Sequence, residues 1–325
     1  MTTVPGMAAG AELARRSGGP AAGGIVRRDI DVNGVRTSYL EKTPTESAPT
    51  LLLLHGGDFS APISAADWVP QLDRLGTRFR VVAPDRLGQG FTDNPSGRYR
   101  YDMASVCAHV GDFVAALGLD RYVVVGHSRG AMSAVSLALA APHRVAGLVV
   151  LDSNTLTPAQ DGATRAFYAR ARERRLGDTE TDLVRREPAL NSYAEDHLTD
   201  DFIGSRLDVW RSARAAAARE AMADEQTRTG FLRDVDRLRQ TVLQAIDRGE
   251  LRADVLVVWG REDPSAPLAR GLELFHLLAD SPDRDVRLHV VNHAGHYAFR
   301  ERADEVSAVV AGFAAARLST DSRAR

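Results

Sequence analysis

Residues 123–130 read Val-Val-Val-Gly-His-Ser-Arg-Gly, and the sequence around them decides the fold. The three valines favour a strand, whereas the Ala-rich run that follows Gly130 has the spacing of a helix. A serine between two glycines in a strand–turn–helix is typical of an exposed nucleophile, because small neighbours relieve the crowding of the turn. The helix that begins behind Ser128 also favours negative charge near its first N–H groups. We therefore predict that Ser128 is a catalytic nucleophile.

Short apolar runs recur along the chain and alternate with helical spacing. The pair Asn33-Gly34 lies between alternating residues and predicts a hairpin over residues 25–41. Later apolar runs have the length of strands buried on both faces: 50–54, 79–83, 122–125, 146–151, 255–259 and 286–291. Helical spacing is found at 68–75, 103–117, 131–141 and 303–318. This alternation predicts an α/β protein with a mostly parallel, doubly wound sheet.

The alternation breaks between residues 155 and 249, where only helical spacing is found, at 167–176, 201–218 and 231–246. The segment is too long for a plain loop. We therefore predict a helical cap over residues 155–249, inserted into a core of residues 25–154 and 250–318. The Ala- and Gly-rich residues 1–24 are expected to form a flexible extension, and residues 319–325 a short tail.

Charge, hydropathy and cysteine content exclude several classes of function. The chain has 41 basic and 43 acidic residues, a net charge of −2, which favours neither nucleic acid nor an anionic membrane as a partner. No apolar run is long enough to cross a membrane. No Cys/His spacing or Gly-rich motif predicts a metal or a nucleotide cofactor. The single cysteine, Cys107, rules out an internal disulfide and is expected to pack in a helix. We expect the protein to be cytoplasmic, and the sequence leaves open whether it forms a homo-oligomer.

A serine hydroxyl needs a general base, and in this arrangement the base comes last in the chain, after the nucleophile and the acid. Two histidines, His293 and His296, follow the last core strand. We favour His296, because Gly295 frees the backbone for a tight loop. His293 is the alternative; otherwise it would only shape the turn.

The base in turn needs a carboxylate that fixes its tautomer and stabilises the imidazolium. Asp263 follows the strand predicted at 255–259, at the end where sites form in open α/β sheets. Asp152 ends an earlier strand and is the alternative acid, unless it only bonds to loop amides. We predict a triad of Ser128, Asp263 and His296.

The loop of residues 55–58, His-Gly-Gly-Asp, follows the first buried parallel strand. In an acyl-transfer site, such a loop and the residue after the nucleophile supply donors for the oxyanion. We expect these donors to be the backbone N–H groups of Gly57 and Arg129. The Arg129 side chain would either line the pocket or form a salt bridge. Three further residues are expected to contact the substrate: Gly56, Asp58 and His127.

Over residues 25–318 the chain resembles the α/β-hydrolase superfamily, and within it the meta-cleavage-product hydrolases of the carbazole and cumene pathways. The resemblance lies in five segments: Gly-Gln-Gly-Phe-Thr-Asp-Asn-Pro (88–95), Gly-His-Ser-Arg-Gly-Ala (126–131), Asp-Ser-Asn-Thr-Leu (152–156), Asp-Pro-Ser-Ala-Pro-Leu (263–268) and Gly-His-Tyr-Ala-Phe-Arg-Glu (295–301). Those enzymes hydrolyse a carbon–carbon bond of 2-hydroxy-6-oxo-dienoates. Three features depart from the pattern: the long extension, Asp58, and Tyr297, which stands where many members carry a pocket tryptophan.

The resemblance also implies a role for Arg206. Residues 198–206 are similar to a cap helix of the family whose arginine binds the substrate carboxylate, and a guanidinium suits a planar carboxylate. Arg206 is otherwise one of many surface arginines of the cap. Tyr297 is expected to line the same part of the pocket.

The implied activity is hydrolysis of a small-molecule substrate through an acyl-enzyme, with no metal or organic cofactor. A carboxylesterase or lactonase, and a hydrolase or cyclase that tailors natural products, are alternatives with the same triad. A non-catalytic ligand-binding protein is disfavoured, since a receptor need not keep all three triad residues.

Overall fold

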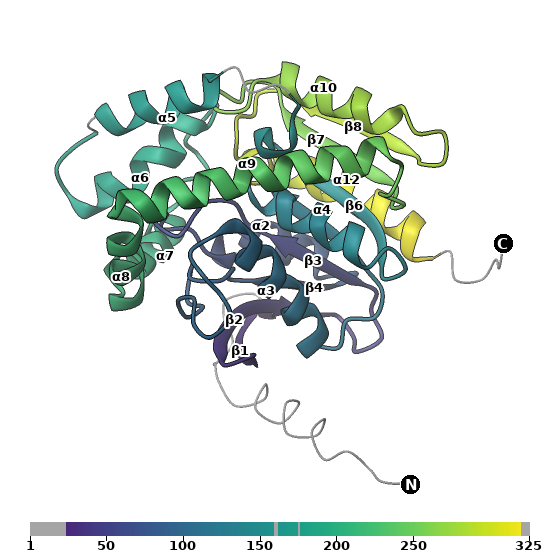
Figure 1. Ribbon diagram of the computed structural model, residues 1–325, viewed down its shortest axis with the longest axis horizontal. Helices are drawn as coiled ribbons and strands as arrows, with labels where there is room; N and C mark the ends of the chain where they lie inside the picture. The colour runs from purple at the N-terminus through teal and green to yellow at the C-terminus, as the bar shows by residue number, and fades with distance from the viewer. Residues whose placement is uncertain (1–23, 159–161, 175, 320–325) are drawn as a thin grey trace, which may run out of the picture.

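The computed structural model describes residues 24–158, 162–174 and 176–319. Almost all of the predicted extension (1–24) and tail (319–325) therefore lies outside the described residues. The core is one eight-stranded sheet in the order β1-β2-β4-β3-β5-β6-β7-β8, in which the pairs from β4 to β8 are parallel and those that β2 makes are antiparallel (Figure 1). The strands are β1 Val26–Val32, β2 Val35–Lys42, β3 Thr50–Leu54, β4 Arg80–Pro84, β5 Tyr122–His127, β6 Val145–Leu151, β7 Val255–Gly260 and β8 Val286–Val291. The predicted fold class is confirmed.

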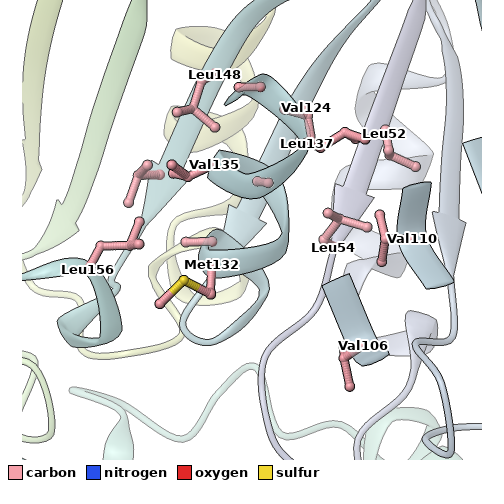
Figure 2. Close-up of a cluster of buried hydrophobic side chains, with 14 of the residues drawn as sticks. Leu52, Leu54, Val106, Val110, Val124, Met132, Val135, Leu137, Leu148 and Leu156 are labelled. Carbon is pink, nitrogen blue, oxygen red and sulfur yellow. The ribbon is translucent and has the colours of Figure 1, made fainter. Parts of the chain in front are cut away.

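Helices cover both faces of this sheet. On one face lie α2 Val69–Leu75, α11 Ala298–Glu301 and α12 Ala303–Leu318; on the other lie α3 Met103–Ala116, α4 Gly130–Ala140, α9 Glu225–Asp247 and α10 Leu268–Ala279. Side chains of β3 alternate between the two layers: Leu52 and Leu54 pack with α3 and α4, and Leu51 packs on the opposite side. Figure 2 shows the first of these layers, where Leu52 and Leu54 lie near Val110 of α3. The continuous apolar runs in the sequence follow from burial on both faces.

Among the described residues between β6 and β7, the short 3-10 helix η3 Asn154–Leu156 is followed by five α-helices: α5 Ala163–Glu173, α6 Glu180–Asn191, α7 Asp200–Arg211, α8 Ala213–Ala223 and α9. In Figure 1 the first four gather beside one end of the sheet, and α9 runs back across α3 and α4. One helix was expected over 201–218, but the structure has two, α7 and α8, interrupted at Ser212. The Ser212 hydroxyl accepts the Ala215 N–H and caps α8. The helical spacing did not reveal α6 or α10. The bounds of a separate cap, residues 155–249, stay a prediction.

In the described part of the chain, no helix combines the length and the apolar character needed to span a membrane.

Candidate active site

Ser128 sits in a strained turn between β5 and α4. Its backbone is left-handed, with φ of 52°, which costs energy for a residue other than glycine. The Ser128 N–H donates to the Leu151 carbonyl (2.9 Å), and the Ser153 hydroxyl donates to the Ser128 carbonyl (2.7 Å). A Cβ on Gly130 would lie 2.2 Å from the Leu54 carbonyl oxygen, so α4 can start this close to β3 only with glycine there. The turn therefore presents the serine at the carboxyl edge of the sheet.

His296 and Asp263 form a buried pair. His296 Nδ1 lies 2.6 Å from Asp263 Oδ2, and Asp263 Oδ1 accepts the N–H groups of Ser265 and Ala266 at 2.8 and 2.7 Å. Burial lowers the pKa of His296, but the charge of Asp263 and its hydrogen bond outweigh burial and raise this pKa to about 9. The bond to the carboxylate assigns the proton to Nδ1 and leaves Nε2 as the basic atom.

The alternative acid, Asp152, and the alternative base, His293, have other contacts. Asp152, also left-handed with φ of 46°, accepts the Gly260 N–H at 2.6 Å. Burial, and after it the charge of Asp263, raise the pKa of the Asp152 carboxyl well above its usual value, which favours the neutral acid. His293 is exposed, and its ring lies 5.3 Å from that of Tyr193. Asp263 is thus the carboxylate that contacts His296.

His127 connects the serine turn to the histidine loop. Burial, followed by the charge of His296, lowers the pKa of His127 well below its usual value, so the ring is neutral. Its Nε2–H donates to the His296 carbonyl at 2.8 Å, and the two rings lie 4.7 Å apart. Among the described residues, the Ser128 hydroxyl and the His296 ring share no direct hydrogen bond; such bonds are often long without substrate. His127, which was expected to contact the substrate, is buried and donates its Nε2–H to the protein backbone.

The two expected oxyanion donors are both available. Gly56 comes so close to Ser128 that a Cβ there would lie 2.8 Å from the serine Cβ, and Gly57 is left-handed with φ of 81°. Within the described residues, neither the Gly57 N–H nor the Arg129 N–H has an acceptor. The Arg129 N–H also lies at the start of α4, where the helix dipole favours negative charge. Free N–H donors in this loop and directly after Ser128 are the kind of group that a tetrahedral oxyanion requires.

The Arg129 side chain forms the salt bridge that was one of its two expected roles. Its Nη1 lies 3.2 Å from Asp58 Oδ2, and the other Asp58 oxygen accepts the N–H and the hydroxyl of Ser60. Burial raises the pKa of Asp58, but Arg129 and Ser60 outweigh burial and lower it. The carboxylate is therefore charged and already paired.

Arg206 is also paired within the protein. It is 1% exposed, and its Nη2 donates to Asp67 Oδ2 and to the Tyr297 hydroxyl, both at 2.8 Å. Glu187 lies 3.6 Å from Arg206 Nη1 and accepts the Tyr297 hydroxyl at 2.6 Å. Burial raises the pKa of Asp67, although the charge of Arg206 opposes this rise. Arg206 Nη2 lies only 2.8 Å from Asp67 Oδ2, and the two side chains form an ion pair. A substrate carboxylate would have to compete with these internal acids.

Sequence reasoning missed Asp67, in the short helix η2 Ala65–Trp68, and Glu187 on α6. Both are single acidic residues without a motif, and they meet Arg206 only in the folded chain. Cys107 is partly buried, with its sulfur 3.6 Å from the Ser133 hydroxyl. The described residues contain no group of His, Cys, Asp and Glu that could hold a metal ion.

The sheet order, the serine turn and the carboxylate–histidine pair define a hydrolase of the α/β class. The chain belongs to the alpha/beta hydrolase fold family, whose model matches residues 49–303.

Similar proteins include several bacterial hydrolases. The chain is 30% identical to a 2-hydroxy-6-oxononadienedioate/2-hydroxy-6-oxononatrienedioate hydrolase of Pseudomonas putida, over 82% of this chain and 88% of that protein. It is 28% identical to epoxide hydrolase A of Mycobacterium tuberculosis, over 90% of this chain and 98% of that protein. A solved meta-cleavage product hydrolase from Pseudomonas fluorescens superposes with a TM-score of 0.68 at 24% identity, covering 88% of this chain and 96% of that one. The predicted resemblance is confirmed, and the chain is a hydrolase.

The contacts of the two aspartates predict opposite effects of their replacement. In the predicted triad the unprotonated form of His296 acts as the base, so we expect kcat/KM to rise as pH rises through the pKa of His296. Asp263→Asn should move this midpoint down from about 9 toward or below 6.5, because burial then acts without the opposing carboxylate. It should also reduce kcat by roughly 10³–10⁴-fold. The measurement is the pH dependence of kcat/KM.

Asp152→Asn is the matched control, because an amide oxygen can still accept the Gly260 N–H. It should change the midpoint and kcat only slightly. A larger loss for Asp152→Asn than for Asp263→Asn would show that the acid has been assigned to the wrong strand.

Proposed function

We propose that this hydrolase cleaves a carbon–carbon bond of a 2-hydroxy-6-oxo-dienoate-like substrate, a vinylogous 1,5-diketone, through an acyl-enzyme on Ser128. The observation that carries the proposal is the buried 2.6 Å contact between His296 and Asp263, in the same site as a strained serine. An imidazole fixed by Nδ1 keeps Nε2 for the serine proton. The named activity of the Pseudomonas putida relative supports the choice of bond.

The proposed steps use groups of the chain and one water molecule. The dienol first ketonises, with His296 helping to move the proton. Ser128 Oγ then attacks the 6-keto carbon while His296 takes its proton, and the N–H groups of Gly57 and Arg129 hold the oxyanion. When the oxyanion collapses, the carbon–carbon bond breaks; its electron pair leaves as a delocalised dienolate, which takes up a proton. Water, activated by His296, releases a carboxylic acid from the serine.

This route requires no metal or organic cofactor, because each charge that develops is stabilised by the substrate, a backbone N–H or the His296–Asp263 pair. The partner is a small molecule. The cytoplasmic location and a homo-oligomer remain predictions.

One observation favours a second candidate, an ester or lactone hydrolase with the same triad. The guanidinium of Arg206 is bound to Asp67 and lies near Glu187, so the arginine expected to bind a substrate carboxylate is already neutralised. A neutral ester has no need of a free cation at this position. The two candidates share every catalytic group and differ in the charge of the substrate.

Ser128→Ala should abolish turnover of both a dienoate and a p-nitrophenyl ester, by about 10⁶-fold in kcat, since the nucleophile is lost. For the wild type, loss of the visible absorbance of a 2-hydroxy-6-oxo-dienoate should be faster than release of p-nitrophenol. Fast ester turnover with an inert dienoate would reject the carbon–carbon proposal in favour of the second candidate. Turnover that survives Ser128→Ala would reject both.

Asp67→Asn should increase the preference for a carboxylated substrate. Removing the internal charge leaves Arg206 partly unpaired, so KM for a carboxylated ester should fall about tenfold relative to its uncharged analogue, in line with about 1.5–3 kcal/mol for a charged hydrogen bond. Steady-state kinetics on the two esters give this ratio.

Asp73→Asn is the control on the protein surface, where Asp73 pairs with Lys42 and its side chain is 58% exposed. It should leave the ratio unchanged. If Asp67→Asn alters KM for both esters alike, Asp67 supports the structure without selecting the substrate.

A further inference from the structure

Arg86 is a buried cation, and no carboxylate in the described part of the chain pairs with it. It is 1% exposed, and among the described residues it forms no salt bridge. Within the residues that the structure describes, its Nε and Nη1 have no hydrogen-bond partner. Asp58, whose charge acts on Arg86, is already paired with Arg129. Burying a guanidinium without an anion is costly, so a use for this charge is to be expected.

The sheet order places the oxyanion loop between Arg86 and the nucleophile. Arg86 follows β4, residues 55–58 follow β3, and Ser128 follows β5; β3 lies between β4 and β5. On one side, Gly56 approaches Ser128 so closely that a Cβ would lie 2.8 Å from the serine Cβ. On the other side, the loop contacts the Arg86 side chain.

The Arg86 guanidinium binds the two carbonyl groups of this loop. Its Nη2 donates to the carbonyl oxygens of Gly56 and Gly57, each at 2.9 Å. His55 strengthens the contact, because its Nε2 accepts the Arg86 backbone N–H at 3.1 Å and its Nδ1–H donates to the Gly56 carbonyl at 2.9 Å. Burial, and after it the charge of Arg86, lower the pKa of His55 to about 3, so the ring is neutral, as this pattern requires.

These bonds determine where the loop N–H groups point. In a trans peptide, a carbonyl and the following N–H point in opposite directions, and no described peptide bond is cis. With the Gly56 carbonyl directed at Arg86, the Gly57 N–H is directed away from it, toward the β5 side of the loop. Two adjacent glycines have little conformational preference of their own, so an external anchor is needed to keep this orientation before substrate binds.

We propose that Arg86 is a positioning residue for the oxyanion hole, an inference that rests on the proposed function of Ser128. Its guanidinium fixes the Gly56 and Gly57 carbonyls, so that the Gly57 N–H faces the nucleophile. Its charge lies behind the loop, where it stabilises the negative oxygen of the tetrahedral intermediate through a site of low dielectric constant. In this account, the negative charge that balances Arg86 is the one that develops on the substrate oxygen during catalysis.

The test compares binding in the ground state with binding of a transition-state mimic. Arg86→Met keeps much of the buried stem but loses the charge, both bonds to the loop carbonyls and the 3.3 Å bond to Gln89 Oε1. For p-nitrophenyl butyrate, kcat should fall about 10–100-fold, with KM changed less than threefold; removal of a direct oxyanion donor costs about 10²–10³-fold. Affinity for butylboronic acid, which forms a tetrahedral anion on serine, should fall by a similar factor, whereas affinity for butyramide should not change.

Arg284→Met is the matched control, because Arg284 is also buried and also binds backbone carbonyls, those of Leu278 and Leu251, away from the site. It should lower the melting temperature without changing the ratio of boronate to butyramide affinity. The same change of ratio in Arg284→Met, or no change in Arg86→Met, would overturn the proposal.

Arg86→Lys is the second variant if Arg86→Met does not fold. It keeps the charge but not the planar fork, and its boronate affinity should lie below that of the wild type. Equal loss of boronate and butyramide affinity, or no loss of either, would overturn the role of Arg86. Failure of the proposed function is a separate result, because turnover would then survive Ser128→Ala while Arg86 is intact.

Discussion

The structure depends on the strained backbone of Ser128. A left-handed serine between β5 and α4 is held by its neighbours: a Cβ on Gly130 would lie 2.2 Å from the Leu54 carbonyl oxygen, and the Ser128 N–H donates to the Leu151 carbonyl of β6. Three adjacent parallel strands are thus tied to one turn. The same contacts hold the serine close to the loop of residues 55–58 after β3. Strain at this residue is balanced by the packing of the whole sheet.

Pairs of opposite charge hold most of the other side chains of the site in place. Asp263 is held by the Ser265 and Ala266 N–H groups and raises the pKa of His296, which makes the imidazolium favourable once a proton has moved. Arg206 is matched by acids of the chain itself, which disfavours the view of this arginine as a free carboxylate receptor. Under the proposed function, the reacting groups are preorganised, and we expect substrate selectivity to depend on how firmly Arg206 is held by Asp67 and Glu187.

Much of this arrangement could be predicted from the sequence, because its signals are local. Ser128, Asp263 and His296 each follow an apolar run closely, and the parallel sheet gathers the carboxyl ends of its strands. The rest depends on contacts between distant segments. Asp67 and Arg206 are 139 residues apart and belong to no shared motif. The break at Ser212 could not be read from helical spacing, since α7 and α8 continue it on both sides. Arg86 is one of many arginines until the fold buries it.

The central claim, that Ser128 is an activated nucleophile, is tested most directly by covalent labelling. A fluorophosphonate should add once per chain, and trypsin should release the label on residues 122–129, Tyr-Val-Val-Val-Gly-His-Ser-Arg, identified by mass spectrometry. The account predicts that Ser128→Ala removes this adduct and that His296→Ala slows its formation by at least about 100-fold. No adduct on the folded wild type, or an adduct that persists in Ser128→Ala, would contradict it.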